Sequence, residues 1–177
     1  MRATVAGCYR VPVPCSPIRR NLYLGSAAMG GASPHIEVHP EPLMWIHEES
    51  IETTASPARV WELLANVEKW GDWNAGIERI ELHGPFANGT QFTMQPPGQD
   101  PFISTLVDVR PNEGFVDETV VDGTRVLVDH QLVSLPSGHT KIVYRTEITG
   151  PDAAAFGPMV TSDFPDVLAA LKRLAER

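Results

Sequence analysis

The sequence is short of cysteine. Of 177 residues only two are cysteines, Cys8 and Cys15, and residues 44 to 177 contain none. Disulfide bonds therefore cannot hold the larger part of the chain together, and a reducing compartment is the expected environment. The sequence predicts a cytoplasmic protein whose core depends on packing alone.

Long apolar runs and positive charge are also scarce. No stretch approaches the roughly 18 consecutive apolar residues that a membrane-spanning helix needs, so stable membrane insertion is not expected. Lys and Arg together number 14 against 22 Asp and Glu, which gives a net charge of −8. Nucleic-acid binding requires a basic surface, and this balance argues against it.

Motifs that identify metal or nucleotide enzymes are missing. The sequence has no CxxC, HExxH, GxSxG, Walker A or GxGxxG pattern. Its histidines lie on different predicted elements without the spacing of metal ligands: His35, His39, His47, His83, His130 and His139. We therefore expect neither a metal site nor a cofactor.

Residues 1–43 differ in composition from the rest. They contain "VPVPCSP", "GSAAMGGASP" and "HPEP", without helical or strand periodicity. We expect a disordered extension, with Met29 or Met44 as an alternative translation start. A second reading is an export signal, since "RRNLYL" and the small residues after it (19–32) resemble a twin-arginine signal. The apolar stretch is weak, and the first reading is preferred.

Residues 44–177 read as one domain that begins with a strand and two short helices. "MWIHEESIETTA" (44–55) alternates loosely and predicts a strand, with His47 and Glu49 on its inward side. In "SPARVWELLANV", Ser56 can cap a helix and Pro57 suits its first position, while apolar residues repeat at i, i+3, i+4 and i+7. "EKWGDWN" follows as a second short helical turn.

The middle of the chain changes to a period of two. Strands are predicted at 77–84, 90–95, 102–110, 115–121, 124–135 and 140–149, separated by turn sequences such as Asn88-Gly89 and Asp122-Gly123. Short connections make them an antiparallel meander. The end, from Pro151, is helical, and Pro158 and Pro165 bend or break it, so one kinked helix and two shorter helices are both open.

This order predicts an α+β fold in which a curved seven-stranded antiparallel sheet wraps around a long C-terminal helix. A twisted sheet closing on one helix does not fill its own concavity, and ligands bind in such spaces. Alternation turns Phe92, Met94, His130 and Tyr144 toward that concavity.

The residues "TTASPARVWELLANVEKWGDWNAGIERIEL", "NGTQFTM" and "SDFPDVLAALKRLAE" carry a resemblance to a known superfamily. The chain resembles START-like or SRPBCC proteins, with the helix-grip fold of Bet v 1-type allergens, lipid-transfer domains and aromatic polyketide cyclases. It is most similar to the bacterial polyketide cyclase/dehydrase group over residues 44 to 176. The resemblance implies that the first helix packs under the sheet and that the Trp70–Trp73 turn closes the corner beside the pocket.

Three functions follow as hypotheses. The first is binding of a small hydrophobic or aromatic molecule in the cavity, lined by Trp73, Phe92, Met94, His130, Tyr144, Phe156 and Met159. The second is an aromatic cyclase or dehydrase in which His130 and Tyr144 supply acid–base groups. Against it stands a buried His130 that is simply hydrogen-bonded to Tyr144 or the backbone, and a Trp73 that only plugs the core. The third, least favoured, is a co-chaperone-like module that binds a protein partner.

Overall fold

The computed structural model describes residues 44–177. The predictions of a disordered extension, of an alternative start at Met29 and of an export signal fall on residues 1–43 and lie outside the described residues. Within residues 44–177, no helix is long and apolar enough to cross a membrane.

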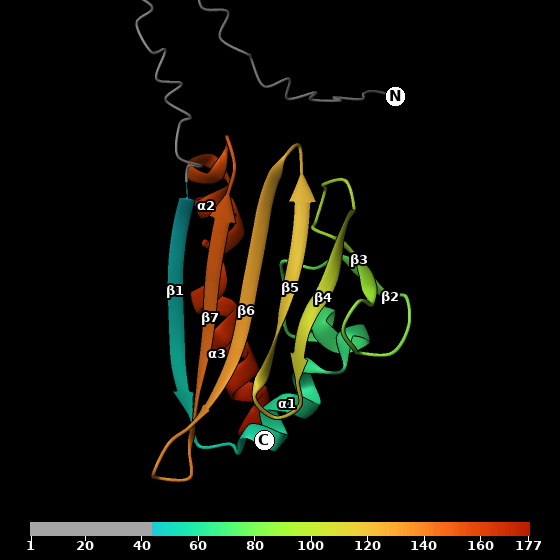
Figure 1. Ribbon diagram of the computed structural model, residues 1–177. Helices are drawn as coiled ribbons and strands as arrows, with labels where there is room; N and C mark the ends of the chain where they lie inside the picture. The colour runs from blue at the N-terminus through green and yellow to red at the C-terminus, as the bar shows by residue number, and fades with distance from the viewer. Residues whose placement is uncertain (1–43) are drawn as a thin grey trace, which may run out of the picture. The chain divides into compact units, whose positions relative to one another are not determined.

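The described chain forms seven strands and four helices (Figure 1). They follow one another as β1 (Met44–Thr53), α1 (Pro57–Leu64), the 3-10 helix η1 (Val67–Asp72), β2 (Arg79–Leu82), β3 (Gln91–Gln95), β4 (Phe102–Arg110), β5 (Gly114–Val121), β6 (Thr124–Ser134), β7 (Thr140–Thr149), α2 (Ala153–Thr161) and α3 (Phe164–Ala175). The predicted order of elements, and with it the fold class, is confirmed.

The strands form a single antiparallel sheet in the order β1-β7-β6-β5-β4-β3-β2. β1 pairs with β7, so the first strand lies beside the last one. α2 and α3 pack on one face of the sheet and form the second layer of the fold (Figure 1). The register places His130 opposite Phe115 on β5 and opposite Tyr144 on β7. Side chains directly opposite one another point to the same face, so these three rings lie side by side.

The C-terminal segment that packs on the sheet is two helices rather than one. α2 contains Pro158, and α3 starts after a break at Ser162 and Asp163. Pro165 lies in the first turn of α3, where its missing N–H leaves no hydrogen bond unmade. This decides between the two arrangements that the prolines had left open.

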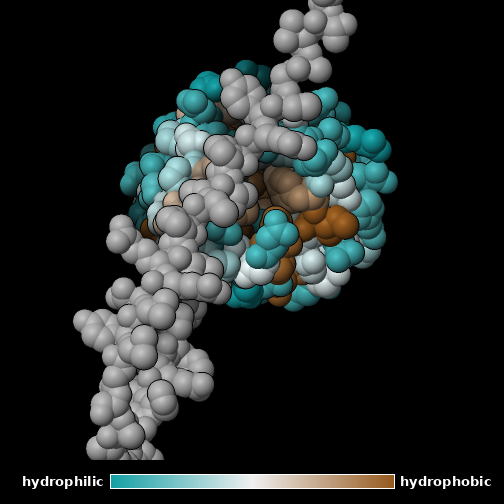
Figure 2. Space-filling model, turned by 90° about the horizontal axis from the view of Figure 1, so that it is seen from above, coloured by the Kyte–Doolittle hydropathy of each residue, from teal (hydrophilic) through white to brown (hydrophobic). Residues whose placement is uncertain are grey.

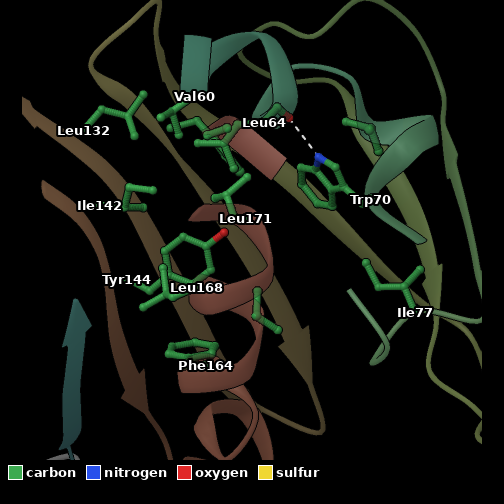
Figure 3. Packing of buried hydrophobic residues seen from close by; sticks show 14 of the residues in the cluster. Val60, Leu64, Trp70, Ile77, Leu132, Ile142, Tyr144, Phe164, Leu168 and Leu171 are labelled. Carbon is green, nitrogen blue, oxygen red and sulfur yellow. Dashed lines mark hydrogen bonds between the residues drawn. The ribbon is translucent and has the colours of Figure 1, made fainter. Parts of the chain in front are cut away.

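The core joins α1, η1 and α3 to the inner face of the sheet (Figure 3). Ser56 caps α1 by accepting a hydrogen bond from the Arg59 N–H at 3.3 Å, as the sequence predicts. Trp70 is 6% exposed and donates from Nε1 to the Leu64 carbonyl at 2.9 Å. Its ring packs on Phe92 and Phe115. Trp70 is therefore a core residue that fixes η1 against the sheet.

Candidate functional site

A cavity of about 140 Å³ lies between the sheet and the helices η1, α2 and α3. Its walls are mostly apolar and come from every layer of the fold. They are formed by Leu64, Trp70, Trp73, Asn74, Gly76, Ile77, Met94, Phe115, Val128, His130, Tyr144, Val160, Asp163, Phe164 and Val167. Figure 2, which looks down on the end of the domain where α2 lies, shows apolar surface gathered around a hollow.

A row of rings crosses the sheet at this cavity. Phe115 and His130 stack with centroids 4.2 Å apart, and His130 meets the edge of Tyr144 at 4.3 Å. Tyr144 in turn contacts Phe164 of α3 edge-on at 5.4 Å. The strand register creates this row, and Gly114 permits it. A Cβ on Gly114 would lie 2.0 Å from the His130 carbonyl oxygen, and its φ is +135°. Glycine therefore lets β5 begin close against the backbone of His130.

His130 is paired with a carboxylate. Its Nε2 lies 3.0 Å from Asp117 Oδ2, and both residues are 9% exposed. A carboxylate accepts hydrogen bonds, so we assign the tautomer with its proton on Nε2, which leaves Nδ1 as the acceptor. Nδ1 is buried and has no hydrogen-bond partner within residues 44–177. The pair thus presents an oriented hydrogen-bond acceptor.

Trp73 supplies a complementary group to the same cavity. Its Nε1 is buried and finds no acceptor in the described part of the chain. The indole N–H can only donate. Among the residues that line the cavity, His130 therefore carries an unpartnered acceptor and Trp73 an unpartnered donor. Trp73 also borders an outer groove of about 480 Å³ between η1 and the end of α3, where Lys69 and Arg173 lie.

Tyr144 is a neutral phenol in this setting. It is 3% exposed, and its burial raises its pKa well above the usual value of about 10, with the negative charges of Asp117 and Asp163 adding to the shift. The hydroxyl therefore keeps its proton across the physiological range. Tyr144 can contribute a hydrogen bond or ring contact but not a phenolate base.

Asp163 adds a second carboxyl group, at the start of α3. Burial raises its pKa, and the charge of Asp166 adds to that effect. Its side chain makes no capping hydrogen bond to the helix. Its Oδ2 lies so close to Gly76 that a Cβ there would be 2.7 Å away. The η1–β2 connection and the start of α3 thus meet at this carboxyl.

Of the seven residues proposed as ligand contacts, the structure places four in the cavity wall: Trp73, Met94, His130 and Tyr144. It places the other three elsewhere. Phe92 is 2% exposed in the core beside Trp70, because its side chain lies under η1 rather than at the cavity. Phe156 packs in a separate cluster with Trp45 and Ile148. Met159 is 71% exposed, on the face of α2 that points to solvent.

The surroundings of His47 and the hydrogen-bond partner of His130 differ from the predictions. His47 faces inward as predicted, but its ring stacks on Trp45 and contacts Phe164 instead of bordering the cavity. The expected hydrogen bond from His130 to Tyr144 or the backbone is wrong, since its partner is Asp117. Sequence patterns alone do not predict Asp117 and Asp163 as site residues, because acidic residues are expected on outer, solvated faces. The signal for Asp117 was available, because it shares its strand parity with the buried Phe115.

Metal binding finds no support in the geometry. No group of three or more His, Cys, Asp or Glu side chains in residues 44–177 could hold a metal ion. The polar groups of the cavity are arranged as one carboxylate–imidazole pair, a phenol, a second carboxyl and an indole N–H.

Comparison with known proteins gives a family and a fold. A family model described as polyketide cyclase / dehydrase and lipid transport matches residues 44–176. No curated protein sequence matches the chain.

Three solved structures illustrate the structural likeness. The Zhui aromatase/cyclase from Streptomyces sp. R1128 is 18% identical, with a TM-score of 0.65, over 76% of this chain and 95% of that one. Truncated norcoclaurine synthase from Thalictrum flavum is 15% identical, with a TM-score of 0.62, over 75% and 94%. Ara h 8.0201 is 15% identical, with a TM-score of 0.60, over 75% and 97%. At such identities the likeness concerns the fold alone.

Proposed function

Since this chain belongs to the polyketide cyclase/dehydrase and lipid transport family, we propose that it binds a small hydrophobic or aromatic molecule in the cavity between the sheet and helices α2 and α3. One observation supports this most strongly. A largely apolar cavity contains two buried polar atoms, His130 Nδ1 and Trp73 Nε1, that lack partners within the described residues.

Buried polar atoms without a hydrogen-bond partner destabilise the folded protein. A buried donor or acceptor without a partner costs about 1–3 kcal/mol. Native proteins satisfy nearly all of these atoms, and the exceptions call for an explanation such as a ligand or an ordered water. A ligand that fills the apolar space and reaches both atoms would remove this cost.

Native mass spectrometry of the full chain, purified from its own host, tests the proposal. We expect a retained molecule that is released on denaturation. Val128→Phe, which fills the cavity, should lose the retained mass, with Val160→Phe as a second filling variant should the first not fold. Val120→Phe is the matched control, because Val120 lies on β5 and is 61% exposed. Equal retention by Val128→Phe and Val120→Phe would place the ligand elsewhere and contradict the proposal.

A second function, cyclase or dehydrase chemistry, is favoured by the Asp117–His130 pair. A carboxylate on one ring nitrogen fixes the tautomer and supports proton uptake at the other. His130 Nδ1 would then remove a proton from a bound ketone, while the neutral Tyr144 hydroxyl could donate a hydrogen bond to its oxygen. His130→Gln should lower turnover of such a substrate by about 10²–10⁴-fold if His130 is the base. A carrier would lose only modest affinity.

The partner-binding alternative finds little support in the exposed surface. The large hydrophobic residues that are exposed are spread over β1, β4, β5, β6 and α2 rather than gathered into one stripe: Met44, Ile46, Ile103, Val107, Val120, Val133 and Met159. Isolated apolar residues are normal on protein surfaces.

A further inference from the structure

Resting on the proposed function, we infer that the ligand is a single-ring aromatic molecule carrying a hydroxyl group, and that this hydroxyl donates a hydrogen bond to Nδ1 of His130. The inference joins three properties of the cavity: its volume, the opposite hydrogen-bonding character of its two unpartnered atoms, and the rings in its wall.

The volume sets the size of the ligand. Pockets for drug-sized molecules enclose about 300–1,000 Å³, whereas an apolar cavity of about 150 Å³ holds benzene. The cavity here, at about 140 Å³, matches the second case. A molecule of two or more fused rings would exceed this volume, and the wall beside Phe115 and Val167, which are 0% and 5% exposed, leaves no room for it inside.

His130 sets the polar group that the ligand must carry. In the tautomer that carries its proton on Nε2, facing Asp117, Nδ1 accepts a hydrogen bond. Ethers, carbonyls and hydrocarbons cannot donate to it. An ionised carboxylate cannot donate either, and it would meet Asp163 in the same wall. A hydroxyl or an amine remains.

Trp73 decides between these two. Its buried Nε1–H needs an acceptor, and none exists for it among residues 44–177. An alkylammonium group has three donors and no lone pair, whereas a hydroxyl oxygen both donates and accepts. A hydroxyl can donate to Nδ1 of His130 and still accept from a donor such as the Trp73 indole, whereas an ammonium can only donate.

The remaining wall suits an aromatic ring. Trp70, Phe115, Tyr144 and Phe164 border the cavity. Figure 3 shows Tyr144 and Phe164 beside α3 and Trp70 beside η1. Offset-stacked and edge-to-face contacts of rings add to the burial of apolar area. A ring of benzene size thus fits the space in both volume and chemistry.

Calorimetric titration of the full chain with a small series of compounds tests the inference. We expect phenol to bind about tenfold or more tightly than toluene, which can make neither hydrogen bond, and more tightly than anisole, which keeps the oxygen but lacks the donor. We also expect phenol to bind more tightly than benzylamine and than 2-naphthol. Toluene or anisole binding as well as phenol would overturn the hydroxyl, tighter benzylamine binding would favour an amine, and equal 2-naphthol binding would overturn the single ring.

Two variants locate the effect. His130→Leu should abolish the preference for phenol over toluene while toluene still binds, whereas His83→Leu, a change at an exposed histidine, should leave it intact. Trp73→Phe should reduce the preference several-fold. Trp61→Phe is its control, because Trp61 packs on Phe86 outside the cavity. The compound series on the unmodified chain remains decisive even if a variant does not fold.

The outcomes also distinguish failure of the hydroxyl inference from failure of the proposed function. Toluene that binds as well as phenol overturns the hydroxyl but leaves the proposed function standing. If none of the compounds binds, the inference is overturned, and the retained mass in native mass spectrometry then shows separately whether a different molecule occupies the cavity.

Discussion

Individual side chains of the cavity wall differ in how the fold sets their charge. The Asp117 carboxylate is hydrogen-bonded to His130, and burial keeps the Tyr144 hydroxyl neutral. Asp163 has neither a hydrogen-bond donor from a side chain nor a capping role, and its pKa is raised by burial. Ionisation of Asp163 therefore works against the folded state.

Asp163→Asn should stabilise the protein at neutral pH. A pKa that is higher in the folded than in the unfolded chain means that the folded state binds the proton more tightly, so stability is lost as pH rises through the folded pKa. Asparagine stays neutral and avoids that loss. Urea unfolding should show a higher midpoint for the variant at pH 7, and the advantage should fade below the unfolded value of about 3.9.

The exposed Asp100→Asn provides the matched control, since it changes the same net charge outside the cavity. A variant at Asp163 that is less stable than the unmodified chain at pH 7, or equal to Asp100→Asn at every pH, would show that burial of this carboxyl has no effect on folding.

The sequence located the inward side chains of the strands but not their partners. Strict alternation placed His130 and Tyr144 on the inner face, and the register confirms it. The same rule applied to β5 turns Asp117 inward. An acidic residue is usually expected to face solvent, so the sequence alone does not predict Asp117 as a partner of His130. Asp163 carries no periodic signal, because it lies in the break between α2 and α3.

Among the elements, α2 depends on a close approach to β1. The Trp45 indole lies against Gly157, so closely that a Cβ there would be 2.3 Å from Cε2. Gly157→Ala should therefore destabilise the fold by about 1–3 kcal/mol, the usual cost of overpacking, even though alanine favours a helix by about 1 kcal/mol. Denaturant unfolding measures this difference.

A double-mutant cycle assigns the effect to that contact. In a Trp45→Leu background the Gly157→Ala change should cost much less, because the obstructing ring is gone. An equal cost in both backgrounds, or a stabilising Gly157→Ala, would mean that α2 is not positioned by this packing.

α3 is held at its other end by Glu176. The carboxylate accepts hydrogen bonds from Thr53 Oγ1 and the Thr54 N–H, both at 3.0 Å, and the bond to the Thr54 backbone is the main reason that its pKa is lowered. A lowered folded pKa gives stability that is present above the unfolded pKa of about 4.3 and lost as pH falls through the folded value.

Glu176→Gln should accordingly lower the melting temperature at pH 7, and the deficit should shrink in acid. Thermal unfolding from pH 7 down to about pH 3 measures it. Glu52→Gln, at an exposed position on β1, is the control. A deficit at Glu176 that does not change with pH would refute the role given to its charge.

The sequence predicts the helices and strands better than the break between α2 and α3. The strands follow from alternation and from turn sequences such as Asp122-Gly123, where both residues have positive φ. Pro165 is compatible with the start of a helix and with a kink inside one. The sequence therefore does not distinguish one kinked C-terminal helix from two shorter helices. The choice depends on how α2 docks through Trp45 and Gly157, a contact between residues far apart in the chain.

The described domain as a unit combines a family fold with a small cavity. Structures with 14–18% identity share the fold with TM-scores from 0.60 to 0.66. Fold at this distance does not specify a ligand. The features that point to one are local, namely the cavity volume and the two unpartnered atoms, and neither could be predicted without the side chains in place.

A titration of the full chain with toluene, followed by NMR of its valine methyl groups, tests the existence of a ligand-binding cavity most directly. Toluene needs no hydrogen bond, so it tests the apolar space independently of the hydroxyl. We predict saturable shifts for the lining residues Val128, Val160 and Val167, and none for the exposed Val120 and Val133. Shifts confined to the exposed valines, or no saturable shift at all, would contradict the account.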